Sequence, residues 1–240
     1  MTCVLQLDGV SKRYGALTVT DDISFRIEAG ETYGILGPNG AGKTTLFNLI
    51  SGDVHPDRGT VRFAGREISD LPPYRRCVAG IGRSYQVPRP FGGMTVFENL
   101  LVGASFGARV AESEAYSICV DVLERTGLKH KANTLAGGLT LLDRKRLELA
   151  RALATRPSLL LLDEIAGGLT EPEARVLVDE IKQIKASGIT ILWIEHVMHA
   201  LMAVADRLLV INFGRKLAEG LPAQVMEDPE VKRVYLGLEA

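Results

Sequence analysis

The chain has 240 residues, 46% of them hydrophobic, which is enough to bury the core of one large domain. Its 28 Lys and Arg residues nearly balance 29 Asp and Glu residues, so it lacks the broad positive field by which nucleic-acid-binding proteins neutralise phosphates. Nucleic acid is therefore excluded as the main partner. Three dispersed cysteines provide neither a disulfide framework nor a metal-ligand spacing, as is typical of a reducing cytosol.

The first segment, residues 4–63, consists of short apolar runs broken by Gly, Asp and Pro, which predicts strands joined by turns. Phe25 and Ile27 alternate with polar residues, as in a half-exposed antiparallel strand. Residues 32–36 are more continuously apolar and predict a buried strand. Residues 43–51 then have the apolar spacing of a helix, which a glycine ends, so this part reads strand, glycine loop, helix.

Residues 86–155 have few strand signals and two helical stretches, near residues 114–125 and 141–155, so we interpret them as a helical insertion. Within this insertion the basic run Arg144 to Arg146 is interpreted as a solvated helix face, because the near-zero net charge argues against nucleic-acid contact.

Strands and helices alternate after the insertion. An apolar run at residues 159–162 ends at Asp163, a helical stretch covers residues 173–185, and residues 190–194 form another apolar run. This alternation predicts a parallel sheet covered on both faces. Residues 207–211 and 216–219 flank Asn-Phe-Gly-Arg and predict a late hairpin.

No segment offers the roughly 20 uninterrupted apolar residues that span a bilayer. The most apolar long region, residues 189–213, is interrupted by Glu195, His196, Asp206 and Arg207. The N-terminus lacks the basic start and long apolar stretch of a secretory signal, so we expect the chain to be mature as written. A role at a membrane would therefore need a partner that spans it.

The glycine loop carries the clearest chemical signal. Gly37-Pro-Asn-Gly-Ala-Gly-Lys-Thr44 fits the phosphate-loop pattern G-x-x-x-x-G-K-[ST], after a buried strand and before a helix. Its glycines let backbone N–H groups point at phosphate oxygens, Lys43 would reach the β and γ phosphates, and Thr44 would hold Mg²⁺. The residues expected to bind ATP here are Gly37, Pro38, Asn39, Gly40, Ala41, Gly42, Lys43, Thr44 and Thr45.

Two acidic residues end the apolar run Leu159-Leu-Leu-Leu-Asp-Glu164, at the edge where open parallel sheets bind ligands. Successive strand residues point in opposite directions, so the two carboxylates can have different tasks. We expect Asp163 to hold Mg²⁺ through water and Glu164 to polarise the attacking water. Alone, the pair would fit a polar strand end or a helix cap equally well.

These elements and the rest of the chain resemble the ATP-binding cassette superfamily along essentially its whole length. The resemblance implies that Tyr14, in Val10-Ser-Lys-Arg-Tyr-Gly15, stacks on adenine, although it also fits a half-buried strand tyrosine. It implies that Gln86 contacts Mg²⁺ and links the core to the helical insertion, and that His196 senses the γ-phosphate. A metal pair of His196 and His199 is conceivable, but no third ligand is apparent. Residues 167–170 follow the acids where the family has its inter-subunit contact loop.

The fold that the resemblance implies is an α/β phosphate-loop NTPase. It has a RecA-like parallel core sheet, an N-terminal antiparallel β part and an α-helical insertion subdomain. We expect residues 1–240 to form a single ATP-binding domain, with residues 1–85 and 156–240 as the nucleotide-binding core and residues 86–155 as the helical subdomain.

The family's signature, typically Leu-Ser-Gly-Gly-Gln, is altered here. It runs directly into a basic helix, which in this chain is residues 144–153, so the register places the signature at Leu139-Thr-Leu-Leu-Asp143. Thr140 keeps the hydroxyl that faces the nucleotide of the opposing subunit, while Leu141 and Leu142 replace the glycines that allow close backbone approach. This is either a degenerate site beside a competent one in a heterodimer or a tolerated variant.

Two segments resemble the ATP-binding subunits of branched-chain amino-acid importers, residues 91–100 and the tail from Val225 to Gly237. Relatives that import urea or other amides, the lipopolysaccharide-export ATPase, and a weakly hydrolysing partner in a heterodimer remain alternatives. The resemblance implies a homodimer or heterodimer with a second ATP-binding subunit, transmembrane permease subunits and, indirectly, a periplasmic or extracellular substrate-binding protein. It also implies ATP and Mg²⁺ as ligands and a cytoplasmic location, on the inner face of the membrane through the permease.

Overall fold

The computed structural model describes residues 2–236 and divides into two compact units. The first unit contains residues 2–73 and 190–236, and the second contains Tyr74–Ile189. The helical subdomain expected at residues 86–155 lies within the second unit, which also includes residues on both sides of it. Gly237, the end of the tail noted in the sequence, lies outside the described residues, as do the ends of the expected 1–240 domain.

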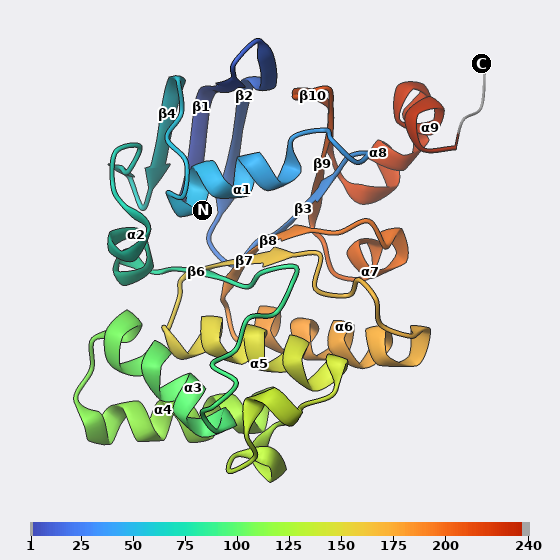
Figure 1. Ribbon diagram of the computed structural model, residues 1–240. Helices are drawn as coiled ribbons and strands as arrows, with labels where there is room; N and C mark the ends of the chain where they lie inside the picture. The colour runs from blue at the N-terminus through green and yellow to red at the C-terminus, as the bar shows by residue number, and fades with distance from the viewer. Residues whose placement is uncertain (1, 237–240) are drawn as a thin grey trace. The chain divides into compact units, whose positions relative to one another are not determined.

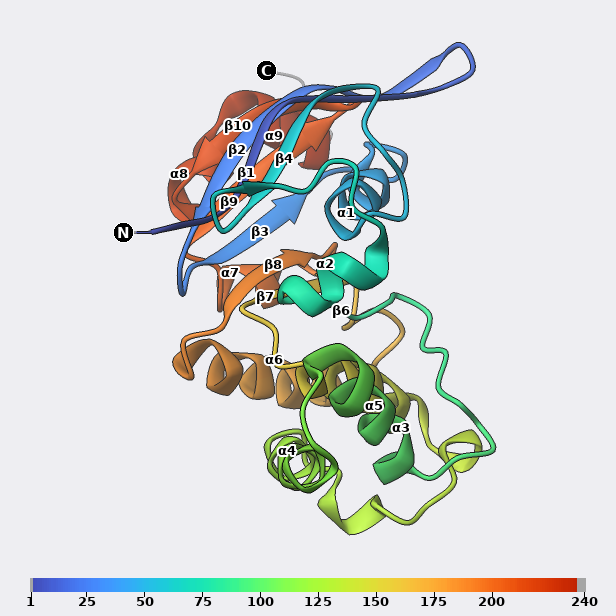
Figure 2. The same cartoon turned by 90° about the vertical axis from the view of Figure 1, so that its left-hand side faces the viewer.

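The first unit contains two groups of strands (Figures 1 and 2). One is an antiparallel sheet in the order β2-β1-β4-β5, and the other has the order β10-β9-β3-β8, in which β3 is parallel to β8 and β9. These strands are β1 (Cys3–Tyr14), β2 (Leu17–Glu28), β3 (Thr32–Leu36), β4 (Arg58–Phe63), β5 (Arg66–Glu67), β8 (Thr190–Ile194), β9 (Arg207–Asn212) and β10 (Arg215–Gly220).

The parallel strands β3 and β8 are buried along their whole length. Every residue of β3 and β8 is buried, as expected of strands covered on both faces. By contrast, β2 buries alternate residues, including Phe25 and Ile27, as a half-exposed antiparallel strand does. The expected bounds of β3 and β8 and the late hairpin of β9 and β10 are confirmed.

Four helices belong to the first unit: α1 (Lys43–Ser51), α7 (Met198–Met202), α8 (Pro222–Glu227) and α9 (Pro229–Leu236). Helix α1 has the predicted bounds and ends at Gly52, whose φ of 89° is left-handed and suits a glycine C-cap. Helices α7 to α9 were not predicted from the sequence. They are short, and proline begins α8 and α9, a position where proline favours a helix start.

The second unit is mainly helical. Its elements are α2 (Pro73–Ala79), β6 (Ile81–Arg83), α3 (Val96–Val102), the π-helix η1 (Gly103–Ala108), α4 (Glu112–Arg125), the 3₁₀ turns η2 (Lys129–Lys131) and η3 (Ala136–Gly138), α5 (Leu141–Ala154), β7 (Leu159–Asp163) and α6 (Glu171–Ala186). Strands β6 and β7 pair in parallel, and all five residues of β7 are buried.

Helix α4 contacts α3, α5 and α6, and Figure 2 shows it along its axis beside α3 and α5. Its buried residues Ala115, Cys119, Val122 and Leu123 recur at helical spacing, which gives it one apolar face. The predicted helices α4, α5 and α6 are confirmed within two residues at each end. Within residues 2–236, no helix is both long enough and apolar enough to cross a bilayer.

Candidate functional site

The phosphate loop begins with Gly37, directly after β3. Gly40 and Gly42 have φ angles of 80° and 100°, in the left-handed region that side-chain-bearing residues rarely adopt. A Cβ on Gly37 would lie 2.5 Å from the carbonyl oxygen of Ile211, and one on Gly42 would lie 2.4 Å from that of Val19. The backbone is therefore packed and curled in a way that requires glycine at these positions.

Lys43 begins helix α1 and curls back over the loop. Its side chain is buried, and Nζ donates hydrogen bonds to the carbonyl oxygens of Gly37 at 2.6 Å and Pro38 at 3.1 Å. Thr44, which follows it, is exposed. A buried ammonium and a helix N-terminus beside a glycine-curled backbone have the chemistry of a polyphosphate cradle, so these residues fit ATP.

His196 and Tyr14 also belong to the first unit. His196 follows β8 with its side chain 55% exposed, and its Nδ1 is 3.4 Å from a carboxylate oxygen of buried Glu195. The same oxygen accepts the backbone N–H groups of His196 and Val197, so Glu195 holds this strand end. Tyr14 is exposed at the end of β1, where the Nζ of Lys12 lies 5.8 Å from its ring centroid. An exposed ring can stack on a base.

The two carboxylates at the end of β7 have different partners within the second unit. Asp163 forms an ion pair with Arg83 of β6, with 3.0 Å between Oδ2 and Nη2, and both side chains are largely buried. The Arg83 guanidinium also lies 4.7 Å from the ring centroid of Tyr85. The sequence did not reveal Arg83, because 80 positions separate it from Asp163 along the chain.

The side chain of Glu164 contacts that of Gln86, the residue that the resemblance assigned to Mg²⁺. The Gln86 amide Nε2 donates to Oε2 of Glu164 at 2.6 Å. Glu164 has a φ of 44°, which is uncommon for a residue with a Cβ and which turns the chain sharply after β7. Such backbone strain is frequent at functional sites.

Asp163 and Gln86 in the second unit, and Thr44 in the first, carry carboxylate, amide and hydroxyl oxygens, the types of ligand that suit Mg²⁺. Within residues 2–236, no group of three or more His, Cys, Asp and Glu side chains could hold a metal ion by itself. Mg²⁺ bound by groups of these types would therefore need nucleotide and water oxygens as further ligands, as it commonly does. The conceivable His196 and His199 metal pair acquires no third ligand of these types within those residues.

Helix α5 begins where the sequence register places the signature. Thr140 is its N-cap: the hydroxyl accepts the backbone N–H of Asp143 at 3.3 Å and donates to the Asp143 carboxylate at 2.7 Å. Burial acts to raise the pKa of Asp143, but hydrogen bonds from Lys131 and Thr140 outweigh it and hold that pKa below its ordinary value. Leu141 is 47% exposed and Leu142 half-buried, so the helix start presents apolar side chains.

The solvated-face interpretation of residues 144–146 is wrong for two of the three. Arg144 is exposed, but Lys145 is only 4% exposed and Arg146 is paired with Glu180. Tertiary packing of α5, which a run of basic letters does not reveal, sets this burial. The Lys145 ammonium instead lies among the main-chain atoms of Gln86 and Glu164.

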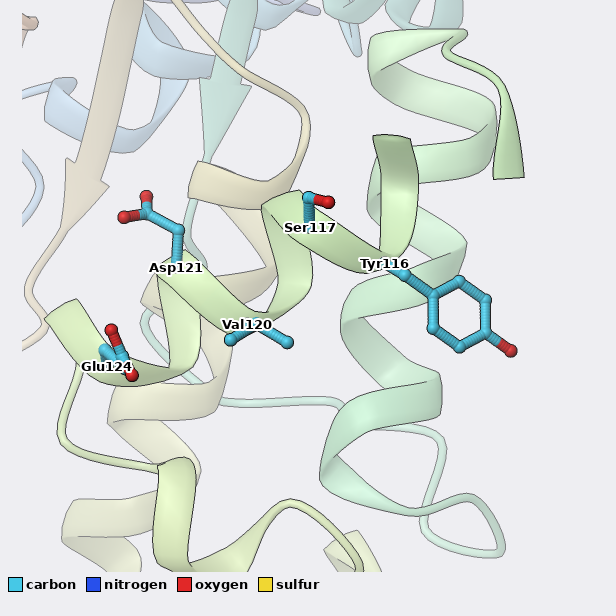
Figure 3. Close-up of a pocket in the computed structure, with 5 residues that line it drawn as sticks. All are labelled: Tyr116, Ser117, Val120, Asp121 and Glu124. Carbon is cyan, nitrogen blue, oxygen red and sulfur yellow. The ribbon is translucent and has the colours of Figure 1, made fainter. Parts of the chain in front are cut away.

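A hollow elsewhere on the second unit is no rival site. About 420 Å³ in volume, it is lined by Tyr116, Ser117, Val120, Asp121 and Glu124, all from α4. Figure 3 shows that Tyr116 projects away from Asp121 and Glu124, so the polar groups do not converge on one point.

Comparison with known proteins gives consistent matches. Residues 20–167 match the family model described as ABC transporter, and residues 215–240 match one described as branched-chain amino acid ATP-binding cassette transporter. The high-affinity branched-chain amino acid transport ATP-binding protein BraF of Pseudomonas aeruginosa is 37% identical, over 98% of this chain and 98% of its own. The lipopolysaccharide export system ATP-binding protein LptB of Haemophilus influenzae is 33% identical, over 98% and 97%.

Among solved structures, the ADP conformation of MJ1267, an ATP-binding cassette of an ABC transporter, matches with a TM-score of 0.90 and 32% identity. The match covers 99% of this chain and 100% of that one. The predicted family and the predicted cassette fold are thereby confirmed.

Proposed function

Because the chain belongs to the ABC transporter family, we propose that this ATPase subunit powers a bacterial importer of branched-chain amino acids. The observation that carries the nucleotide chemistry is the glycine-curled loop with buried Lys43 at the start of α1. The match of residues 215–240 to the branched-chain amino acid cassette model supports the cargo class.

For nucleotide binding, we assign the phosphates to residues 37–45, with the Lys43 ammonium exchanging its two carbonyl partners for phosphate oxygens. Tyr14 stacks on adenine, and Thr140, Leu141 and Leu142 face the nucleotide held by a second ATP-binding subunit. The core at residues 1–85 and 156–240 carries the nucleotide, and the segment from Gln86 to about Gly107, in the helical subdomain at residues 86–155, contacts the permease.

For hydrolysis, Thr44, Gln86 and Asp163 would hold Mg²⁺. When bound, this ion neutralises charge on the terminal phosphate. Glu164 accepts a hydrogen bond from the attacking water and orients it, with Gln86 fixing the carboxylate at 2.6 Å. His196, whose imidazole is exposed at the end of β8, hydrogen-bonds the terminal phosphate.

The proposed assembly is a homodimer or heterodimer of ATP-binding subunits on two permease subunits, at the inner face of the membrane. A substrate-binding protein outside the membrane would deliver the cargo.

The test is transport by the complete complex, in which this chain is reconstituted in vesicles with its permease subunits and their substrate-binding protein. We expect Mg·ATP-dependent uptake of leucine, isoleucine or valine, and no uptake when this chain carries Glu164→Gln. ATP-driven movement of urea or an amide, or lipopolysaccharide extraction as the LptB likeness would suggest, would refute the cargo assignment. Absence of ATP hydrolysis by the full complex would refute the function itself.

A further inference from the structure

We propose that Lys145 is a positioning residue for hydrolysis, whose buried ammonium fixes the main chain of Gln86 and Glu164 so that their side chains meet. The inference rests on the proposed function, because it concerns the pair assigned to orient the attacking water. It gives a role to a residue that the sequence pattern placed on a solvated face.

The Lys145 ammonium has two main-chain partners. Lys145 Nζ donates to the carbonyl oxygen of Gln86 at 2.9 Å and to that of Glu164 at 3.2 Å. The side chains of these same two residues meet at 2.6 Å. The Lys145 ammonium therefore bridges the main chains of Gln86 and Glu164, whose side chains are already hydrogen-bonded to each other.

Burial shows that this arrangement is specific. Lys145 is 4% exposed, and an ammonium removed from water is unfavourable unless hydrogen bonds compensate it. Charge-assisted hydrogen bonds to carbonyl oxygens are stronger than neutral ones, so they offset that cost and restrain the two carbonyl groups.

The conformation of Glu164 explains why restraint matters there. Its φ of 44° is unfavourable for a residue with a Cβ and persists only if surrounding contacts hold it. A bond to its carbonyl oxygen fixes the peptide that follows this turn. Without that bond, we expect the carboxylate to sample positions away from Gln86.

Two more α5 residues hold the segment that contains Gln86. Glu148, one turn further along, accepts the backbone N–H of Arg89 at 3.4 Å, and Arg151 donates to the Arg89 carbonyl oxygen at 2.9 Å. Burial raises the pKa of Glu148 although Arg151 lies beside it. Lys145 differs from Glu148 and Arg151 because it also contacts Glu164. Its removal should therefore disturb the contact between Gln86 and Glu164 more than the packing of the Gln86 segment on α5.

The test compares Lys145→Met, Lys145→Arg and Lys182→Met in the complete transporter complex. Lys182 is the matched control, since it lies on α6 with an exposed side chain paired to Asp179. We expect Lys145→Met to lower kcat for ATP about 100-fold while KM changes less than about twofold, because misplacing a catalytic group by about 1 Å has that effect. Lys145→Arg should recover activity to within about tenfold of wild type, and Lys182→Met should match wild type.

Amide hydrogen exchange supplies a readout independent of turnover. In Lys145→Met, amides of residues 85–89 and 164–167 should exchange about tenfold faster, while those of α4 remain unchanged. Unchanged kcat and exchange in Lys145→Met would overturn the proposal, as would faster exchange throughout the second unit or an arginine variant as inactive as the methionine one. If wild type itself fails to hydrolyse ATP, the proposed function fails, whereas the exchange result still decides whether Lys145 holds this segment.

Discussion

Replacing Arg83 by methionine should destabilise the chain, because it removes the cation beside a buried carboxylate. The side chains of Arg83 and Asp163 are 7% and 5% exposed, and Nη2 and Oδ2 lie 3.0 Å apart. At that separation two unit charges attract by about 5 kcal/mol with an effective dielectric constant of about 20. Breaking such a pair from one side costs about 3–5 kcal/mol, so we expect the free energy of unfolding to fall by about 3 kcal/mol.

The measurement is urea denaturation at pH 7 followed by circular dichroism, with the denaturant slope checked for constancy between variants. Arg175→Met is the control. It removes an exposed arginine paired with Glu171 and should change stability by less than about 0.5 kcal/mol. The double variant Arg83→Met with Asp163→Asn should regain about half of the loss, because both charges of the ion pair are then removed together. A loss below about 1 kcal/mol for Arg83→Met would refute the reasoning.

Three further predictions concern the site. Glu164→Gln should keep ATP affinity within about threefold and lower turnover at least about 100-fold, because the amide is a poor acceptor for the water proton. Steady-state hydrolysis measures this turnover, and an unchanged rate would show that Glu164 does not orient the water. Lys43→Ala should weaken ATP binding, measured by calorimetry, at least about tenfold, since a charge-assisted phosphate contact is lost. Equal affinity would contradict the assignment of residues 37–45 to the phosphates. Thr140→Ala should cost about 1 kcal/mol of stability as a lost N-cap and should lower hydrolysis. Gly138→Ala should do neither, because it lies in Leu135-Ala-Gly-Gly-Leu139, four residues before the assigned signature, and its added Cβ meets nothing within 4 Å. The reverse order would show that the assigned signature register is wrong.

Strong local signals made much of the fold predictable. The buried strands β3 and β8 and helix α1 were predicted with their observed bounds, because continuous apolar runs and glycines delimit them. Helix α3 was missed despite a capping box in which Thr95 and Glu98 satisfy each other's backbone N–H groups. It is seven residues long and continues as a π-helix, so it lacks the repeated apolar spacing on which the prediction depended.

Some residues of the candidate site could be proposed from the sequence, and others could not. The phosphate loop and the two acids at the end of β7 could be proposed from the sequence, because chemistry fixes their residue types at a fixed spacing. The contacts of Arg83 with Asp163 and of Lys145 with Glu164 could not, because they join residues 80 and 19 positions apart, and burial alone distinguishes them from surface charges. The sequence of a helix does not show which of its charged side chains tertiary packing will bury.

The left-handed backbone of Glu164 has an evolutionary consequence. Glycine would adopt its φ of 44° without the penalty of about 1–2 kcal/mol that a Cβ carries there. Selection for stability alone thus favours losing the carboxylate, whereas the proposed role of Glu164 in hydrolysis would retain it. Related subunits that no longer need to hydrolyse ATP should accumulate glycine or asparagine at this position. The residue found there would then distinguish hydrolysing subunits from non-hydrolysing ones.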